Sequence, residues 1–571
     1  MTMATLLRTA LTAAPTALGA AVAITLIITS LSLIHRLFSN ASLPNNLPWV
    51  GVGKYDSRLG RAKGNLTGFF HLNKLLDEGY VKYSKNDQTY VLPYFINGPQ
   101  VVLPPSQIPW LMAQADDVLS QEHVNRQFLQ AEYSFFHANM VEGPVHPEIV
   151  QHQLTKKISG FTAALVDEVR ACLDDYWGTD TDEWREVRVY DTLLLLIARM
   201  VTRVLMGLPL CRDEAFVAIC GNFIRKVALA AGAISLFPSF LKPIVGPIFT
   251  LFDYILYRRC SNFLMPVIRE RLDRLRERGT VTGTGKIPLQ SATAHNDYVQ
   301  WAVDHALAKP VANPAEFEPR VIAARFSVLA FAAIQSSVIT LTNAVFDLAA
   351  SGSCAGSLAA MREEVLRETM TATHDENNNN NNNNKAGGEG SERGWTKTAL
   401  ARMTHVDSAL RESLRINGFV ERGIMKMVVA PAGVTLPDGS HVPRGTKVGV
   451  SGYSIHHDEG NYVDAKRYDA FRFARPRDGD GDAAGKKEKE KKKKKRPQGL
   501  VNTSETFLSF SHGSHACPGR FFATNQLKIA LGHIALLYDI EPVAERPANK
   551  WLFGHIAPPL TETLRVRRRK M

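Results

Sequence analysis

The chain has 571 residues, of which 45% are hydrophobic and 21% are charged. These are ordinary values for a globular protein, so they exclude wholesale disorder. The net charge of +12 comes from two tracts: residues 486–496 carry nine cations and two anions, and Arg565–Lys570 carries five cations. Such runs are usually solvated loops or tails, and the remaining chain is near neutral. The basic isoelectric point therefore does not predict a nucleic-acid-binding surface.

Cysteine usage excludes two further classes of protein. The six cysteines are too few for a disulfide scaffold in a chain of this size, and none forms a C-x-x-C pair of the kind that binds zinc. A reducing compartment fits this usage best. The cysteines are Cys172, Cys211, Cys220, Cys260, Cys354 and Cys517.

A long uncharged segment lies between Arg8 and His35. As a helix, Thr9–Ile34 would be about 39 Å long, enough to cross a hydrocarbon core of about 30 Å. A cleaved signal peptide is the alternative, but its apolar region would be shorter and a small-residue cleavage site should follow. Four cations lie within residues 54–63, against Arg8 alone on the other side. This asymmetry predicts a retained anchor with the rest of the chain in the cytoplasm.

The sequence predicts three regions: a membrane anchor at residues 1–38, a proline-containing hinge at 39–64 and a catalytic region at 65–571. Two low-complexity inserts interrupt the last region. Residues 374–394 contain eight consecutive asparagines, and residues 478–499 are rich in Gly and Asp and then in Lys. Because neither insert can bury a core, we expect both to be disordered surface loops.

Most of the chain from residue 65 to residue 420 has a helical pattern, and the strand-like stretches are short. Residues 326–350 are apolar but interrupted by polar side chains, so they predict a buried core helix rather than a second membrane span. The fold class is mainly α with small peripheral β-sheets. Expected helices include Leu154–Tyr176, Val189–Met206, Asp297–Ala308 and Ala399–Asn417; expected strands are Thr89–Phe95, Gln100–Leu103, Lys426–Val429, Thr435–Leu436 and Lys447–Val450.

The most informative segment is a loop that leads through Cys517 into an apolar helical run, Phe521–Tyr538. At a helix N-terminus, the macrodipole and the free backbone N–H groups favour a thiolate. Gly513 allows a tight turn close to a flat ligand, and Gly519 allows close packing without a Cβ. Phe510 would shield a metal–sulfur bond from water. A lone cysteine is more often an inert small hydrophobic residue, but this spacing is not generic.

The spacing F-x-x-G-x-x-x-C-x-G of Phe510, Gly513, Cys517 and Gly519 resembles the haem-binding signature of the cytochrome P-450 monooxygenases. The resemblance extends over residues 43–570 and implies the cytochrome P-450 fold. It implies that Cys517 is the axial ligand of the iron of haem b, where a thiolate donates electron density that promotes O–O cleavage. His515 occupies the position at which the family carries Arg or His toward a haem propionate.

A second motif, E-x-x-R, is present as Glu412 and Arg415. The i, i+3 spacing places both side chains on one helix face, where they can pair. Alone this spacing is typical of a surface salt bridge. In the family an arginine shortly before the haem loop joins the pair, and Arg472 is the candidate here, although the residues around it lack the family's proline. The resemblance implies a structural role for all three, which is to lock the core that holds the cysteine loop.

A third element is the helix that would cross the distal side of the haem. The resemblance implies that Ala332 and Ala333 leave room for dioxygen and that the Ser336 hydroxyl hydrogen-bonds oxygen and relays protons. Gln335 stands where the family carries an acid, and an amide has no titratable proton near neutral pH. We therefore expect an altered relay. The alternative is an amphipathic core helix with two serines.

Other positions follow the family pattern less closely. His152 and Lys156, at i, i+4, fit a pair that contacts the other propionate, and a solvated helix face fits them equally well. By position, the distal pocket should also be lined by the loop 120–140, by Phe331 and Gln335, and by Val420 and Gly554–His555.

The sequence therefore predicts an endoplasmic-reticulum-anchored, single-pass monooxygenase that resembles members of filamentous-fungal secondary metabolism. It would oxidise a small lipophilic secondary metabolite, a terpenoid by subfamily resemblance, with O2. Electrons would come from an NADPH-cytochrome P-450 reductase, with or without cytochrome b5. Two alternatives stay open: a haem-thiolate enzyme that catalyses rearrangement, dehydration or ring formation, which Gln335 would permit, and a non-catalytic membrane haem-binding protein.

Overall fold

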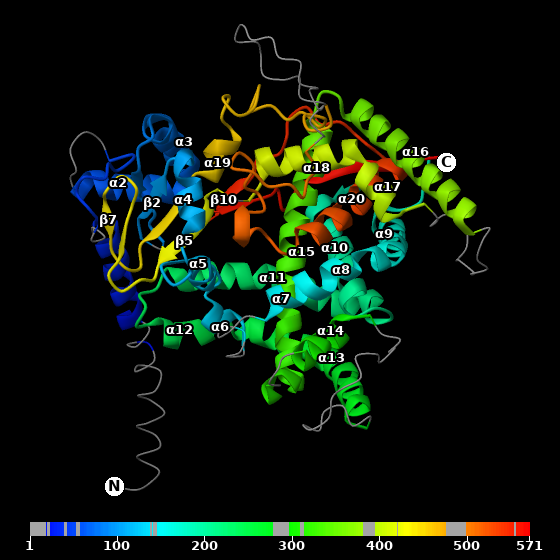
Figure 1. Cartoon of the computed structure of the whole chain (residues 1–571), viewed down its shortest axis with the longest axis horizontal. Coiled ribbons are helices and arrows are strands. Elements are labelled where there is room, and N and C mark those ends of the chain that lie inside the picture. The colour runs from blue at the N-terminus through cyan, green and yellow to red at the C-terminus, as the bar shows by residue number, and fades with distance from the viewer. Residues whose placement is uncertain are drawn as a thin grey trace, which may run out of the picture. The chain divides into compact units, whose positions relative to one another are not determined.

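The computed structural model describes residues 19, 23–38, 43–52, 58–96, 98–136, 140, 145–277, 296–308, 313–380, 394–419, 421–475, 498–552 and 555–570. The described chain is mainly helical with small sheets (Figure 1), as the sequence predicts. Most of the two predicted inserts, at 381–393 and 476–497, lies outside the described residues.

The chain divides into two compact units. Unit 1 comprises residues 1–134, 227–252 and 425–450. Unit 2 comprises residues 135–226, 253–424 and 451–571, and it contains every residue of the three motifs.

Unit 1 is built on a sheet with the strand order β1-β2-β8-β5-β3. The strand β2 (Gln100–Leu103) pairs antiparallel with β1 (Tyr90–Leu92) and parallel with β8 (Lys447–Val450). All side chains of these strands are buried, which explains their continuous apolar sequences. The predictions for β2 and β8 are confirmed to the residue. The strand expected at Thr89–Phe95 is shorter because Pro93, which lacks an N–H, follows β1.

Of the remaining strands of unit 1, β5 and β6 lie close to predicted strands, whereas β3 and β7 were not predicted. The strand β5 (Gly423–Val428) pairs with β3 (Leu119–Ser120). The strands β6 (Val434–Thr435) and β7 (His441–Val442) form a hairpin around Gly439, whose φ of 84° suits glycine.

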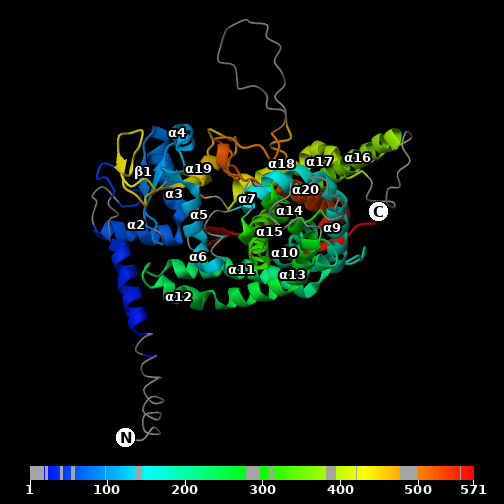
Figure 2. The same cartoon turned by 60° about the horizontal axis from the view of Figure 1, so that its bottom comes forward.

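The helices of unit 1 include a short apolar helix, Ala23–Phe38, that overlaps the predicted anchor. Its base is fixed to the unit, because the Arg36 guanidinium donates to the carbonyl oxygens of Ile96, Ser235 and Phe237, each at 3.1 Å. The other helices are α2 (Arg58–Phe70), α3 (Leu72–Lys82), α4 (Ile108–Ala113), α5 (Gln121–Leu129), α6 (Ala131–Ser134) and α12 (Lys242–Phe249). Figure 2 shows Ala23–Phe38 in dark blue and α12 in green.

Unit 2 is organised around α15 (Pro319–Ala350), a helix of 32 residues and about 48 Å. Pro319 stands at the first helical position, where its missing N–H costs nothing. The helices that pack most extensively against α15 are α10 (Val189–Leu205), α18 (Thr404–Asn417) and α20 (Arg520–Leu537) (Figure 1). The predicted buried core helix is thereby confirmed.

The other helices of unit 2 complete the core around α15. They are α7 (His146–Ile149), α8 (Thr155–Lys157), α9 (Thr162–Trp177), α14 (Tyr298–Leu307), α16 (Cys354–Asn380), α17 (Lys397–Arg402) and α19 (Gly452–His456). The unit boundaries fall within α11 (Glu214–Ser235) and near the start of α13 (Leu251–Glu277). The helix α16 extends through Asn380, into the segment that we predict as a loop.

Two predicted helices are interrupted. In place of one helix at Leu154–Tyr176, a π-helical turn, α8 and a 3₁₀ turn precede α9, and the unfavourable helix former Gly160 lies at the last break. The helix predicted at Ala399–Asn417 divides at Met403. The start of α18 is capped by the buried Glu364 carboxylate, which accepts the backbone N–H groups of Thr404, His405 and Val406.

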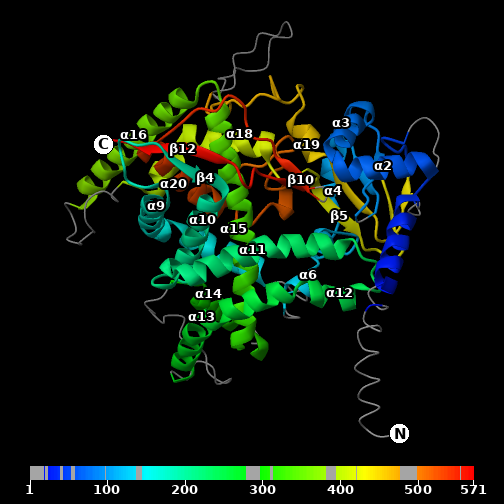
Figure 3. The same cartoon turned by 180° about the vertical axis from the view of Figure 1, so that it is seen from behind.

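The C-terminal cationic tract is not the solvated tail that we predict. It forms most of β12 (Thr563–Arg568), which lies between β4 (Arg185–Arg188) and β9 (Tyr538–Ile540) (Figure 3). Its cations are neutralised locally, since Arg568 pairs with Asp174 and Arg565 pairs with Glu541. The hairpin of β10 (Lys550–Leu552) and β11 (His555–Ala557) precedes it.

Candidate active site

The loop before α20 brings Cys517 back against Phe510. Ser511 and Gly513 both have positive φ, of 59° and 67°, and reverse the chain. The Cys517 N–H then donates to the Phe510 carbonyl at 2.8 Å, which closes the loop. The Ser509 hydroxyl donates to the Leu414 carbonyl at 3.1 Å and so ties the loop to α18.

The electrostatic environment of Cys517 combines burial with hydrogen-bond donors. Burial raises the pKa of the Cys517 thiol, while the backbone N–H groups of Gly519 and Arg520 and the charge of Arg520 oppose that rise. The N–H groups at the start of α20 therefore favour the anionic form of the sulfur. A Cβ at Gly519 would lie 3.9 Å from the sulfur, at ordinary contact distance.

Between Val321 and Ala349 the helix α15 is buried except in one short strip. From Val321 to Ala330 and from Ser337 to Ala349 every residue is buried, whereas Ala332 is exposed and Ala333, Gln335 and Ser336 are partly exposed. This strip is the position predicted for the distal side of the cofactor. Because Ala332, Ala333 and Ser336 are small, they leave space beside the helix backbone at this strip.

The two polar side chains of the strip have different surroundings. The Ser336 hydroxyl donates to the Ala332 carbonyl at 2.9 Å, so its lone pairs stay available as acceptors. Gln335 instead lies beside the buried Tyr190 on α10, where it opposes the rise that burial gives to the pKa of Tyr190. Its carbonyl oxygen has no hydrogen-bond partner among the described residues. Gln335 is thus engaged by α10, and Ser336 is the hydroxyl of the strip.

Glu412 forms a buried network with both predicted arginines. Its carboxylate binds Arg415 in a bidentate pair at 2.7 and 2.8 Å and accepts from Arg472 Nε at 2.8 Å. The side chains of Glu412 and Arg415 are 0% exposed, so the surface-pair alternative is wrong. Arg415 also donates to the carbonyl oxygens of Ala465 and His456. Such bidentate, charge-assisted bonds fix α18 against the segment that precedes the cysteine loop.

The remaining predicted residues are more exposed. His152 lies in the π-helical turn and Lys156 in α8, and both side chains are exposed. His515 is partly buried in the 3₁₀ turn of the cysteine loop. Residues 120–134, which we predict as a pocket loop, instead form α5 and α6. Phe331 packs edge-on against Phe135, and Val420 and Gly554 lie outside the described residues, as does the side chain of His555.

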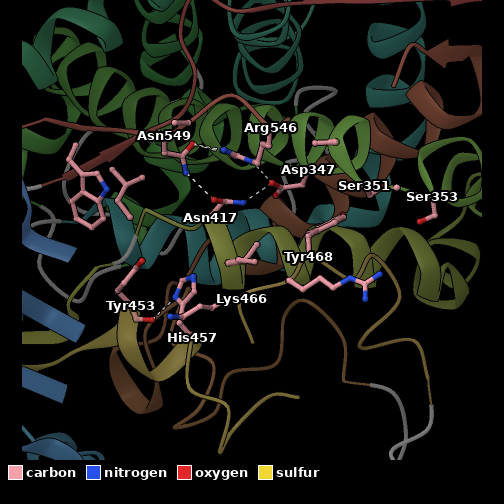
Figure 4. A pocket seen from close by; sticks show the side chains of 17 residues that line it. Asp347, Ser351, Ser353, Asn417, Tyr453, His457, Lys466, Tyr468, Arg546 and Asn549 are labelled. Carbon is pink, nitrogen blue, oxygen red and sulfur yellow. Dashed lines mark hydrogen bonds and ion pairs between the residues drawn. The ribbon is translucent and has the colours of Figure 1, made fainter. Parts of the chain in front are cut away.

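A separate polar cavity of about 770 Å³ lies beside the C-terminal ends of α15 and α18 (Figure 4). Its floor is a network in which the buried Asp347 carboxylate accepts from Ser413, Asn417 and Arg546. Neither Cys517 nor the exposed strip of α15 lines this cavity in the part of the chain that the structure describes. We therefore interpret the network as a structural link that holds α15 and α18 together.

Comparison with known proteins decides the family. The family model for cytochrome P-450 matches residues 122–561. The chain is 31% identical to cytochrome P-450 monooxygenase htyF of Aspergillus rugulosus, over 88% of this chain and 69% of that protein. It is 31% identical to cytochrome P-450 monooxygenase polB of Polytolypa hystricis, over 92% and 94% of the two chains. It is 28% identical to cytochrome P-450 monooxygenase gloP of Glarea lozoyensis, over 94% of both.

The chain belongs to the cytochrome P-450 family. It is a haem-thiolate monooxygenase whose cofactor is haem b and whose electrons come from a reductase. The residues of this cytochrome P-450 fit that group, because a sulfur faces backbone N–H donors at the start of α20 and α15, which packs against α20, exposes small residues. When bound, the haem supplies the activation of dioxygen.

Several residues of this site give little signal in the sequence. His456 contacts Arg415, Arg411 lies against Phe507 and Tyr190 lies beside Gln335. At least 41 positions separate His456 from its partners, and no periodic pattern marks such a pairing. An isolated histidine or arginine in a helical region is more often a surface residue. Only the fold reveals that these side chains are buried.

Proposed function

We propose that this cytochrome P-450 inserts one oxygen atom from O2 into a lipophilic secondary metabolite, with electrons from an NADPH-dependent reductase. One observation carries the proposal: the sulfur of Cys517 faces N–H donors while α15 exposes Ala332 and Ser336. We propose Cys517 as the axial ligand, Ala332 and Ala333 as the residues that leave room for dioxygen, and Ser336 as the hydroxyl that holds a proton there. His515, His152 and Lys156 are proposed contacts of the propionates.

The choice of a terpenoid as substrate rests on likeness alone. The relatives are fungal cytochrome P-450 monooxygenases, and this supports an enzyme of fungal secondary metabolism. Phe331 and Phe135 offer an aromatic surface beside the exposed strip, which suits an apolar substrate. The rearrangement alternative keeps one supporting observation, because Gln335 stands where the family usually carries an acid.

Ser336→Ala tests the proposed proton delivery. The substitution removes the hydroxyl of the strip, so reducing equivalents should be diverted into peroxide and water, while substrate binding changes little. We expect product per NADPH to fall about 100-fold, the lower end of the range for loss of a proton-transfer group. The measurement is product formed per NADPH consumed, with peroxide assayed alongside.

Ser337→Ala is the matched control, because the neighbouring hydroxyl is buried away from the strip. It should retain the wild-type ratio of product to NADPH. An unchanged ratio of product to NADPH in Ser336→Ala would show that Ser336 has only a structural role. Substrate conversion by the wild type without oxygen consumption would favour the rearrangement alternative.

We also propose that unit 1 is anchored on the endoplasmic reticulum membrane with the catalytic region in the cytosol. The helix Ala23–Phe38 exposes apolar side chains, and its base is tied to the unit by Arg36 and by Asn65, which donates to the Leu37 carbonyl at 3.0 Å. A second apolar surface lies on and beside α12. Its exposed members are Phe240, Ile244, Ile248, Phe249, Leu251 and Phe252.

Two longer helices, α11 and α15, are also apolar enough to cross a membrane, but 50% and 72% of their apolar windows are buried. A mostly buried helix is better explained as part of the protein core. The N-terminal helix and the α12 surface are therefore the membrane contacts that we propose.

Removal of residues 1–34 tests this proposal while it keeps the Arg36 tether. The truncated protein should keep its haem but bind membranes more weakly, with residual binding through α12. Adding Ile244→Glu and Ile248→Glu should release it into the soluble fraction, because a charge on a membrane-facing surface is costly. Flotation with microsomal vesicles measures both effects. Loss of haem on truncation would contradict the proposal. Unchanged flotation of the truncated protein that also carries Ile244→Glu and Ile248→Glu would contradict it as well.

A further inference from the structure

His456 lies at the end of α19 and is 2% exposed. Its ring nitrogen Nε2 accepts the backbone N–H of Leu508 at 2.9 Å. The ring also stacks on Phe507, with centroids 5.6 Å apart and planes inclined by 24°. One side chain thus holds two consecutive residues of the segment that enters the cysteine loop.

The same residue reaches the buried ion pair on its other side. The His456 backbone carbonyl accepts from Arg415 Nη1. Since the ring nitrogen Nε2 is the acceptor for Leu508, the proton of the neutral ring lies on Nδ1. His456 therefore links Arg415 on α18, through its backbone carbonyl, to the cysteine loop, through its ring.

From Leu508 the connection continues to the sulfur in two backbone steps. The Leu508 carbonyl accepts the Ser511 N–H at 2.8 Å, and the Phe510 carbonyl accepts the Cys517 N–H at 2.8 Å. A shift of the Leu508 peptide would thus be transmitted to the turn that places Cys517. The Arg411 guanidinium lies over the Phe507 ring, with its Cζ 3.7 Å from the ring centroid, and so supports the same segment.

We propose that His456 is a positioning residue for the haem thiolate: by bridging the Arg415 guanidinium and the Leu508 N–H, it holds the cysteine loop at the register that keeps Cys517 on the iron. This role rests on Cys517 being the ligand. Glu412 and Arg415 hold α18 in place, and the hydrogen bonds of His456 connect the cysteine loop to that helix.

Three substitutions separate the hydrogen bond to Leu508 from the shape of the ring. His456→Gln can place an amide oxygen where Nε2 lies and so keep the Leu508 bond. His456→Asn is too short to reach that position, so it loses the Leu508 bond. His456→Phe keeps the stacking on Phe507 and loses the Leu508 bond. None of the three changes the backbone carbonyl that accepts from Arg415. His457→Phe is the matched control, because His457 bonds to the Tyr453 carbonyl and not to the loop.

The test uses the holoenzyme and follows the red-shifted Soret band of the reduced carbon-monoxide adduct, with the haem-to-protein ratio measured beside it. In His456→Phe and His456→Asn we expect the band to decay about ten-fold faster at a fixed temperature, the effect of about 1.4 kcal/mol from an unpaired buried N–H. His456→Gln and His457→Phe should decay at the wild-type rate.

Wild-type decay in His456→Asn would overturn the proposal, and so would equal impairment of the Gln and Asn variants. Should His456→Phe fail to fold, the comparison of Gln with Asn decides alone. A wild type without the red-shifted band would overturn the assignment of Cys517 itself, and the role of His456 with it.

Discussion

Glu412→Ala is expected to yield insoluble or haem-free protein rather than a slow enzyme. The substitution leaves the fully buried Arg415 without a counter-charge and takes the carboxylate partner from Arg472. Breaking a buried pair in this way costs about 3–5 kcal/mol, a large share of the roughly 5–15 kcal/mol that stabilises a typical domain. The measurements are the soluble yield and the haem-to-protein ratio after purification.

Glu541→Ala is the matched control for that experiment. Glu541 pairs with Arg565 at 3.0 Å, but both side chains are about half exposed, at 42% and 51%. A solvated pair of this kind contributes about 0–1 kcal/mol, so yield and haem content should stay near wild type. A soluble, haem-loaded Glu412→Ala enzyme with near-normal activity would show that the network does not hold the core.

His533→Phe should change how stability depends on pH. Burial, together with the charges of Arg170 and Arg568, lowers the pKa of His533 to about 4. The unfolded chain takes up this proton below about pH 6.5 and the folded chain does not, so wild-type stability falls as pH falls from about 6.5 to about 4. The loss is about 1.4 kcal/mol per pH unit, or about 3 kcal/mol over that window.

The phenylalanine removes this titration and keeps the ring that stacks on Trp395 at 4.2 Å. The free energy of unfolding of His533→Phe should therefore rise by about 3 kcal/mol relative to wild type between pH 7.5 and pH 4. Other titrating groups cancel in this comparison. Denaturant titrations of both proteins at the two pH values measure the gap. A difference in unfolding free energy between the two proteins that does not change with pH would show that His533 keeps its ordinary pKa in the folded protein.

Features that depend on neighbouring residues were predictable from the sequence. The buried strands β2 and β8 and the core helix α15 follow from apolar runs of the right length. The spacing of Glu412 and Arg415 predicts that they share a helix face, and the structure brings them together. These predictions succeed because local periodicity determines which side chains face the core.

Features that depend on distant partners were not predictable. The break at Met403 is stabilised by Glu364, about forty positions away, and Gln335 is turned toward Tyr190 on another helix. The cationic residues of β12 were predicted to form a solvated tail because their acidic partners come from distant parts of the chain. In each case the deciding contact is tertiary, so tertiary packing overrides the local signal.

The reduced carbon-monoxide spectrum of Cys517→His, compared with wild type and Cys354→Ser, tests the central assignment most directly. Cys354 is buried near the Ile540 carbonyl, so its substitution controls for loss of a core thiol. We predict that wild type and Cys354→Ser show the red-shifted Soret band of thiolate ligation and that Cys517→His lacks it even with haem bound. A red-shifted band in Cys517→His would contradict the assignment of Cys517 as the ligand.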